Sequence, residues 1–400
     1  MVDRAGKPRL LVVTSTYPRW PGDTEPAFVH QLASRLVGRF EVVVATSRAP
    51  GAKSSETMDG VKVCRYAYAP IAWETLIYGG GLIGNLRASP WKLLLLPTYF
   101  VCWVWQIVAL KRKYRFEVVH AHWFIPGGLV AALAMRGAPI CVTAHGTAVL
   151  GRKGALWRRL RKFVARRAST LSVVGKRVQD ALDAEGITPT ILLPMGTDLS
   201  GLFVPSDLEI RGGNLLYVGR LIPSKRPEVV LHAFAEVART DPGLTLDVVG
   251  NGPEQRRLET TATELGVRSQ VIFHGRKNQA EIADMYRASG AVVIASGGDE
   301  APEGLGLVAI EALGCGCPVI SAPNIALQAV LPEAAPIRYA RDSSAGALAE
   351  ALRNTMSARA LRMGSSDVAW REELSKRFDW EQVAGRYSHL LGTLAESGEG

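Results

Sequence analysis

The feature that most constrains the fold is a series of short, continuously apolar runs, rich in Val, Leu and Ile, with helical stretches between them. Such runs are typical of strands buried on both faces of a parallel sheet, because a strand with one solvated face alternates apolar and polar residues. The runs are LLVVTS, EVVVATS, FEVVHAHW, PICVTAHG, TLSVVG and TILLPMG, and after residue 200 NLLYVGRL, LTLDVVGNG, VIFHGR, AVVIASGG and CPVISAP.

Two α/β domains in tandem account for a series that stops and restarts. The chain has 400 residues, more than one hydrophobic core normally supports. Between the two series, LPMGTDLSGLFVPSD breaks the pattern with glycines and prolines, as a hinge does. We therefore predict two doubly wound, Rossmann-like domains, over residues 1–198 and 199–379, that face each other across a cleft, with a final helix at 380–400 packing back on the first.

Polar residues stand at the ends of several predicted strands. His120 and His122 follow FEVV, His145 follows CVTA, and Gly219 and Arg220 follow LLYV. Ligands of open parallel sheets bind beyond the carboxyl ends of the strands, so these residues are expected to line a binding site. Fold-level placement does not identify the ligand.

The charge is unevenly divided along the chain. Residues 1–198 contain 27 Lys and Arg against 12 Asp and Glu, whereas residues 199–400 contain 20 against 25. A basic surface attracts nucleic acid, anionic lipid or an acidic substrate. Because basic motifs interleaved with aromatic residues are missing, we expect no nucleic-acid partner.

An uncharged segment at 93–110, LLLLPTYFVCWVWQIVAL, is followed by the basic run KRKYR. Its length touches the lower limit for a membrane span, but a span would place the strands before and after it on opposite sides of the bilayer. We therefore favour a buried or interfacial helix.

A second helix is predicted at 156–168, LWRRLRKFVARRA, with four apolar residues on one face and basic residues around the remainder. The apolar residues are Leu156, Leu160, Phe163 and Val164, and the basic ones are Arg158, Arg159, Arg161, Lys162 and Arg166. Residues 93–115 and 156–168 together predict a peripheral surface for anionic membranes. A core-packed helix with solvated arginines is the alternative for 156–168.

The cysteines and the N-terminus bear on the compartment. The chain has 5 cysteines without a paired C-x-x-C spacing, which favours reduced cytosolic thiols over zinc or a disulfide framework. Near the N-terminus only Leu10 to Val13 form an apolar run, far shorter than the core of a signal peptide. We expect a cytoplasmic protein, peripheral on the inner face of the cell membrane.

The segment YVGRLIPSKRP, 217–227, has the residue types that hold a diphosphate. Gly219 permits close approach of the backbone, Arg220 offers a two-pronged donor, and Lys225 adds a mobile charge. A solvated basic loop is the alternative for this spacing by itself.

The segment EGLGLVAIE, 303–311, predicts a loop that enters a helix. Free N–H groups in the first helical turn attract a phosphate, and the glycines at 304 and 306 leave room for it. Glu303 and Glu311 cannot both serve the phosphate, so we expect them to accept hydrogen bonds from sugar hydroxyls at either end of a nucleotide sugar. The alternative is a solvated helix that carries two glutamates.

GRLIPSK and, some 80 residues later, EGLGLVAIEALGCGCPVI resemble the signature of the retaining GT-B glycosyltransferases of family 4 (glycosyl transferases group 1). TSTYPRWPGD, VVHAHW, TAHGT, LPMGTD and VIFHGR match further parts of the family pattern in order. The resemblance covers nearly the full chain. It implies the GT-B fold, with a nucleotide sugar bound mainly by the second domain and an acceptor mainly by the first.

The resemblance also implies roles for single residues. Arg220 and Lys225 would bind the diphosphate, and Glu311 would bind the ribose. Glu303 and His145 would bind the donor sugar. Backbone groups of Gly304, Leu305 and Gly306 would lie beside the sugar, and those of His274, Gly275 and Arg276 beside the base. On the acceptor side we place the first loop, where the usual glycine pair of the family is replaced by Gly22 and Asp23. His122 is placed there too, with a structural role as the alternative for it and for His120.

The implied reaction is metal-independent transfer of a hexose, with retention and without a cofactor, from a UDP- or GDP-linked sugar to a lipid-linked or polysaccharide acceptor. Its product would be a cell-surface polysaccharide or glycolipid. A nucleotide-sugar epimerase of the same architecture and a non-catalytic nucleotide-sugar-binding membrane scaffold are the alternatives.

Overall fold

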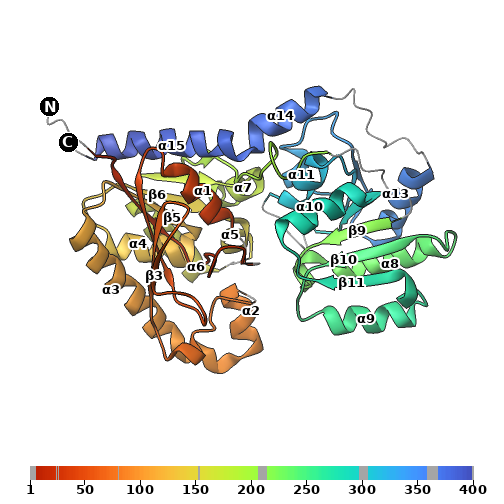
Figure 1. Cartoon of the computed structure of the whole chain (residues 1–400), viewed down its shortest axis with the longest axis horizontal. Coiled ribbons are helices and arrows are strands. Elements are labelled where there is room, and N and C mark those ends of the chain that lie inside the picture. The colour runs from red at the N-terminus through yellow and green to blue at the C-terminus, as the bar shows by residue number, and fades with distance from the viewer. Residues whose placement is uncertain are drawn as a thin grey trace. The chain divides into compact units, whose positions relative to one another are not determined.

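The computed structural model describes residues 6–23, 25, 27–79, 81–151, 154–205, 214–296, 305–357 and 368–398 (Figure 1). The chain divides into two compact units. The first comprises Met1–Gly196 together with Trp380–Gly400, and the second comprises Thr197–Asp379. The chain therefore returns to the first unit for its last helix.

The first unit is built on one sheet. Its strands are β1 (Arg9–Val13), β2 (Glu41–Ser47), β3 (Ser55–Met58), β4 (Val61–Tyr66), β5 (Val118–His122), β6 (Ile140–Ala144), β7 (Thr170–Val173) and β8 (Ile191–Leu192). They lie in the order β3-β4-β2-β1-β5-β6-β7-β8, parallel except for the β3–β4 hairpin. The strand order reverses between β1 and β5, the point at which doubly wound sheets bind ligands.

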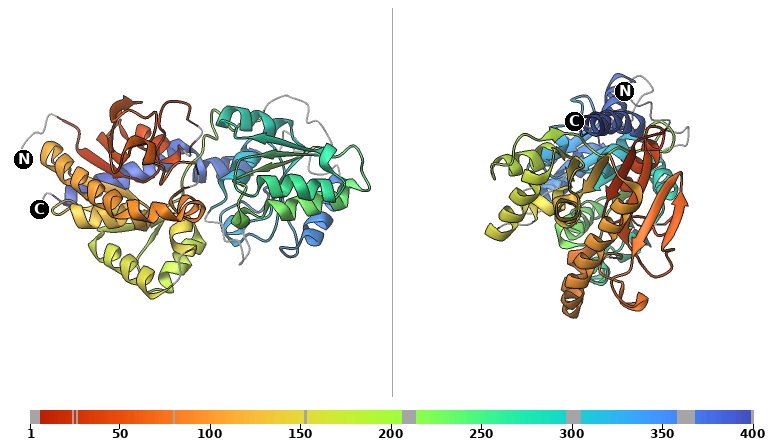
Figure 2. Two further views of the ribbon diagram at one scale, coloured as in Figure 1. Left: turned by 90° about the horizontal axis from the view of Figure 1, so that it is seen from below. Right: turned by 90° about the vertical axis from the view of Figure 1, so that its left-hand side faces the viewer.

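The helices of the first unit are α1 (Phe28–Leu36), α2 (Gly81–Ala88), α3 (Leu96–Tyr114), α4 (Leu129–Ala134), α5 (Gly146–Leu150), α6 (Ala155–Arg167), α7 (Lys176–Asp183) and α15 (Trp380–Ser397). Short 3₁₀ turns cover Ile71–Trp73 and Pro90–Leu95, and a π-helical turn covers Trp123–Gly128. Helix α15 packs on α1 and β5, whereas α3 packs on α4, β2 and β4 (Figures 1 and 2). Tyr387 of α15 is fully buried and donates a hydrogen bond to the carbonyl of Leu193.

The second unit has a six-stranded parallel sheet in the order β11-β10-β9-β12-β13-β14. Its strands are β9 (Asn214–Val218), β10 (Thr245–Val249), β11 (Val271–Gly275), β12 (Ala291–Ile294), β13 (Val319–Ser321) and β14 (Ile337–Tyr339). Its helices are α8 (Pro227–Ala238), α9 (Gln255–Glu264), α10 (Gln279–Ala288), α11 (Leu307–Gly314), α12 (Ile325–Gln328), α13 (Ala345–Ser357) and α14 (Val368–Phe378). The order reverses between β9 and β12, so the ligand position of this sheet is beyond these two strands.

The prediction of two doubly wound, Rossmann-like sheets is confirmed. Strands β1, β5 and β6 show why the apolar runs predict it, because nearly all of their residues are buried. The prediction for TILLPMG is wrong in extent. Strand β8 contains only Ile191 and Leu192, and both side chains are exposed because this short strand lies at the edge of the sheet.

Helix α3 is apolar on two faces. Tyr99, Trp103 and Ile107 are fully buried, and the rings of Tyr99 and Trp103 pack 5.7 Å from the ring of Tyr66 on β4. On the other face, Val101 is 67% and Trp105 is 73% exposed. Among the described residues, Pro90–Tyr114 is the one helix long and apolar enough to cross a membrane. A spanning helix would have to give up its packing on the sheet, so the burial favours a buried or interfacial helix over a span.

Candidate functional site

In the first unit, the candidate site lies where β5 and β6 end. His122 is the last residue of β5, and His145 follows β6 directly. Nδ1 of His122 and Nε2 of His145 are 3.1 Å apart and share a hydrogen bond. The ring of His145 also packs against Phe28, at 5.2 Å, and Trp123, at 4.7 Å between centroids. Residues from two segments, Phe28 on one and His122 with Trp123 on the other, therefore enclose one imidazole.

His120 and His122 are connected to a buried polar network. Nε2 of His120 lies 2.7 Å from the hydroxyl of Thr143, which lies 2.7 Å from that of Ser172 on β7. The rings of His120 and His122 are 4.2 Å apart between centroids. His122 is only 1% exposed. His122 is thus buried at the end of β5, deeper in the protein than His145.

Burial also determines the charge of these histidines. It lowers the pKa of His120 to about 3 and, with a minor contribution from His120, the pKa of His145 to about 3. The pKa of His122 is lowered well below its ordinary value for the same reason. All three rings are therefore neutral at physiological pH, so each can accept a hydrogen bond at one nitrogen and donate at the other.

A tight backbone turn follows His122. Trp123 has a φ of 64°, and the chain passes so close to itself that a Cβ on Gly127 would lie 2.3 Å from the carbonyl oxygen of His122. Only glycine fits at 127 without moving this turn. Gly127, in the PGGL sequence that follows VVHAHW, therefore allows the tight turn that holds the backbone of His122 in place.

The first loop holds its acidic residue in an ion pair. Asp23 accepts two hydrogen bonds from the guanidinium of Arg19, at 2.6 and 2.8 Å, and one from the backbone N–H of Arg19. Burial opposes ionisation, but these bonds outweigh it and lower the pKa of Asp23. Gly22 turns the chain with a φ of 79°. Asp23 therefore stabilises the loop in the described conformation.

In the second unit, glycines allow the strand ends to meet. A Cβ on Gly250, after β10, would lie 1.8 Å from the carbonyl oxygen of Gly219, after β9. The N–H of Gly250 donates to the carbonyl of Gly275 at the end of β11. The three strand ends are thereby packed backbone to backbone. Gly250 also has a φ of 135°, which side chains rarely adopt.

The basic residues of GRLIPSK follow β9. Arg220 is exposed directly after the strand, and Lys225 ends the 3₁₀ turn Pro223–Lys225 before α8. Because β9 pairs with β12, both residues stand at the switch point of the sheet. Arg276 follows β11, two strands away from β9.

Glu311 lies in the second turn of α11, the helix that follows β12. Its Oε2 accepts a hydrogen bond from the hydroxyl of Tyr286 at 3.2 Å, and its Oε1 accepts one from Thr197 at 3.4 Å. Burial raises the pKa of Glu311 to about 7, and the two hydrogen bonds oppose the rise. Sequence reasoning missed both partners. Thr197 belongs to the LPMGTD motif, whereas Tyr286 has no sequence signal.

The start of α11 is partly described. Gly306 precedes the helix with a φ of 78°, and Leu305 is 5% exposed. Glu303 and Gly304 lie outside the described residues. His145 and His122 belong to the first unit, and Arg220, Lys225, Gly275, Arg276 and Glu311 belong to the second.

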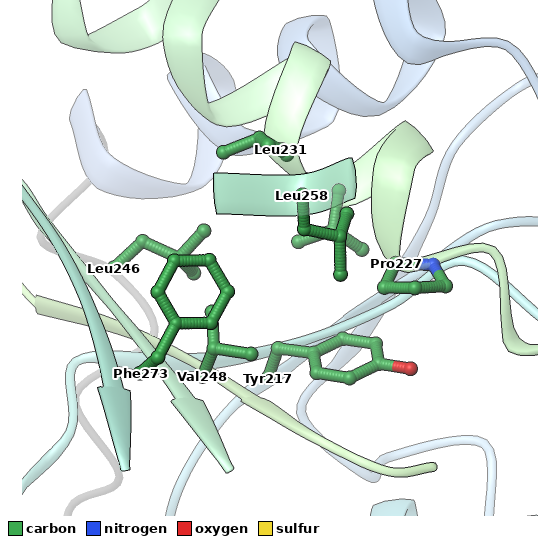
Figure 3. Close-up of a pocket in the computed structure, with 8 residues that line it drawn as sticks. Tyr217, Pro227, Leu231, Leu246, Val248, Leu258 and Phe273 are labelled. Atoms are coloured by element: carbon green, nitrogen blue, oxygen red, sulfur yellow. The ribbon is translucent and has the colours of Figure 1, made fainter. Parts of the chain in front are cut away.

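The described residues also bear on other kinds of site. They include no group of three or more His, Cys, Asp and Glu that could hold a metal ion. A small cavity in the second unit lies between α8, α9 and strands β9 to β11 (Figure 3). Its lining is apolar except for the hydroxyl of Tyr217, so it is part of the core.

Two family models match the chain. "Glycosyl transferases group 1" matches residues 211–366, and "Glycosyl transferase 4-like domain" matches residues 26–196. D-inositol 3-phosphate glycosyltransferase of Frankia alni is 36% identical over 242 residues, 52% of this chain and 57% of that relative. The same enzyme of Segniliparus rotundus is matched over 62% of its length, so the chain aligns with less than two thirds of either relative. Glycogen synthase of Mycobacterium tuberculosis is 28% identical over 94% of this chain and 92% of its own.

Solved structures share the fold over nearly the whole chain. Sucrose-phosphate synthase from Thermosynechococcus elongatus has a TM-score of 0.78 at 22% identity, covering 98% of this chain and 100% of its own. Anabaena HepE in complex with UDP-glucose has a TM-score of 0.73 at 18% identity, covering 96% and 99%. These likenesses show the fold.

Proposed function

Because the chain belongs to the GT-B glycosyltransferases of family 4 (glycosyl transferases group 1), we propose that it transfers a hexose, with retention and without a metal ion, from a UDP- or GDP-linked sugar to a lipid-linked or polysaccharide acceptor. The observation that carries this proposal is the switch point of the second sheet. Arg220 and Lys225 follow β9 there, and Glu311 follows the neighbouring β12.

The donor fits this arrangement part by part. Arg220 and Lys225 neutralise the diphosphate, and Glu311 accepts hydrogen bonds from the ribose hydroxyls. The backbone at Gly275 and Arg276 lies against the base. Glu303, with the backbone of Gly304, Leu305 and Gly306, holds the sugar hydroxyls. The UDP complexes of Anabaena HepE make UDP-glucose the first donor to test.

The proposed reaction breaks the bond between the anomeric carbon and the phosphate oxygen. The bonding electrons leave with the nucleoside diphosphate, and the acceptor oxygen forms its bond to the anomeric carbon on the same face. The departing phosphate takes the proton of the acceptor hydroxyl. Arg220 and Lys225 stabilise the charge on the leaving group, and His145 positions the sugar.

We propose that the acceptor is reached at a membrane surface, to which α3 and the segment before it attach the first unit. The exposed large apolar side chains there are Ile71, Trp73, Ile83, Trp91, Leu93, Leu94, Val101 and Trp105. The rings of Trp73 and Trp91 are in edge contact at 5.9 Å. Indole rings favour the bilayer interface, and basic residues favour anionic headgroups. Lys111, Arg112 and Lys113 in the last turn of α3 supply that charge.

Helix α6 supports this surface less than its sequence predicts. Arg161 is 1% exposed and pairs with Glu185, so it does not belong to the basic ring. Val164 is buried in the core, whereas Leu156 and Phe163 of the predicted apolar face are 66% and 39% exposed. The predicted division of the helix into faces is therefore wrong. Leu156 and Phe163 remain available for the interface, beside the arginines of the same helix.

Two alternative functions use the same donor site. An epimerase would convert the nucleotide sugar without an acceptor, and a membrane scaffold would bind it without turnover. On the acceptor side we retain the loop with Gly22 and Asp23, which is ordered by Arg19. His122, only 1% exposed and bonded to His145, takes the structural role instead and does not itself contact the acceptor. A cytoplasmic location, peripheral on the inner face of the cell membrane, suits an enzyme that consumes nucleotide sugars.

The test is donor consumption with and without acceptor. The purified chain is incubated with UDP-glucose or GDP-linked sugars in a chelator, with and without extracted lipid-linked glycans. Nucleoside diphosphate release that requires acceptor supports the proposal. Conversion of the donor sugar without acceptor would identify an epimerase. Binding of the donor without turnover would identify a non-catalytic membrane scaffold.

A further inference from the structure

We propose that His122 is a positioning residue, which fixes the ring orientation and the tautomer of His145. This inference rests on the proposed function, in which His145 contacts the donor sugar. His122 would act through the hydrogen bond between its Nδ1 and Nε2 of His145, without touching the substrate.

The surroundings of His145 restrict its ring but do not choose a tautomer. Phe28 and Trp123 pack against the imidazole, and the whole residue is 8% exposed. Aromatic contacts hold a ring in place without distinguishing its two nitrogens. A hydrogen bond at Nε2 couples the two rings, because its proton lies either on His122 or on His145 and each choice leaves His145 in one definite tautomer.

The proton count links the tautomer of His145 to that of His122. Burial lowers the pKa of both rings, so both are neutral and one proton lies between Nδ1 of His122 and Nε2 of His145. A neutral imidazole carries a single N–H. The state of Nε2 therefore sets the state of Nδ1 of His145, and with it whether that atom donates to a sugar oxygen or accepts from a hydroxyl.

His122 is itself held firmly enough for this role. Its ring packs on that of His120, which is bound to Thr143. Its carbonyl is enclosed by the turn at Gly127. A side chain that directs another needs such support, since loose partners do not fix geometry.

The experiment combines nitrogen NMR of ¹⁵N-histidine-labelled full-length chain with kinetics. Two-bond ¹H–¹⁵N spectra identify each tautomer, and His145→Ala assigns the signal of His145. We expect one tautomer in the unsubstituted protein and a mixture in His122→Leu. Turnover of His122→Leu should fall about tenfold or more, with KM for the donor changed less than about twofold. His122→Asn keeps a polar atom near the Nδ1 position and should regain most of the turnover.

His30→Leu is the matched control. His30 is also buried, at 8% exposure, and hydrogen-bonded to Tyr17 and Asp59 in the same unit. It should leave the tautomer of His145 and the turnover unchanged. A folded His122→Leu protein with unchanged turnover and a single His145 tautomer would overturn the inference. So would two tautomers in the unsubstituted protein, a result that does not depend on the folding of any variant.

The same variants separate this inference from the proposed function. If His145→Ala retains full turnover, the assignment of His145 to the donor sugar fails. If His145→Ala is inactive while His122→Leu and His122→Asn match the unsubstituted protein, only the positioning role fails.

Discussion

The hydroxyl of Tyr286 donates a hydrogen bond to Oε2 of Glu311 across 3.2 Å, and so joins α10 to α11. Thr197 donates to the other oxygen, across 3.4 Å. The carboxylate is thus held from two sides at the end of the sheet where we place the donor. Its raised pKa, about 7, makes its charge sensitive to pH within the physiological range.

Donor binding should depend on pH through Glu311. A ribose hydroxyl donates to a carboxylate better than to a carboxylic acid, so affinity for a nucleoside diphosphate should fall by up to tenfold per pH unit below about pH 7. Tyr286→Phe removes a bond to the ionised form and should move this midpoint upward. Calorimetric titrations across this range measure both effects.

Tyr339→Phe is the control for that series. Tyr339 lies on β14, and its buried hydroxyl has no hydrogen-bond partner among the described residues. The pH midpoint of nucleoside diphosphate affinity in Tyr339→Phe should equal that of the unsubstituted protein. An affinity that is independent of pH, or a midpoint that moves down in Tyr286→Phe, would contradict the role of Glu311.

The stability of the unligated chain should also depend on Glu311, but should fall as pH rises, whereas donor affinity should increase. The pKa of Glu311 is raised by folding, so its contribution to stability is full below its unfolded pKa and is lost as pH rises through about 7. Glu311→Gln should therefore gain thermal stability relative to the unsubstituted chain between about pH 5 and 8. Melting temperatures across this range test it, and a constant difference would speak against the raised pKa.

Lys225 should be required for turnover. Lys225→Ala removes a charge from the proposed leaving-group site and should lower kcat by about 10²-fold or more. Lys376→Ala, on the exposed part of α14, is the matched control and should retain activity. Steady-state kinetics with saturating acceptor measure this, and full turnover in Lys225→Ala would refute the phosphate assignment.

Gly250→Ala should disturb the loop that carries Arg220. Its new Cβ would overlap the carbonyl of Gly219, 1.8 Å away. We expect the free energy of unfolding to fall by about 2–4 kcal/mol and donor affinity to fall more than about tenfold. Gly243→Ala, at an exposed site with ordinary contacts, should change neither. Unfolding curves and donor titrations of both variants measure these effects. Unaltered donor binding in Gly250→Ala would contradict the importance of Gly250 for the loop that carries Arg220.

Attachment to membranes should depend on both apolar and basic residues of α3. Trp105→Ser with Val101→Ser should lower binding to anionic vesicles severalfold, and added salt should weaken binding of the unsubstituted chain. Ile272→Ser replaces a 47% exposed residue of the second unit and should bind normally. Vesicle sedimentation measures these effects. Equal binding to neutral vesicles at all salt concentrations would exclude the electrostatic part.

The sequence predicts what depends on local pattern. The buried strands are recognisable because their apolar runs, such as VVV in β2, need no knowledge of distant residues. The glycines and basic residues after β9 are likewise read from one short segment. Helix α3 is recognised as a helix, but only the packing of Tyr99 and Trp103 shows which of its apolar faces is covered.

Contacts between distant residues are what the sequence does not predict. Thr197 and Glu311 are 114 residues apart, and Tyr286 is 25 residues from Glu311. Helical periodicity places Arg161 on a solvated face. In the structure Arg161 is buried and donates a hydrogen bond to Glu185. The pairing of His122 with His145 follows from the neighbouring positions of β5 and β6, which the apolar runs do not order.

Calorimetric titration of the unsubstituted chain and of Lys225→Ala with UDP and GDP, in the presence of a chelator, tests the central claim most directly. We predict that one of the two nucleotides binds with 1:1 stoichiometry without metal, and that Lys225→Ala weakens it by about tenfold or more. Failure of both nucleotides to bind, or equal affinity in Lys225→Ala, would contradict a diphosphate site at the end of β9.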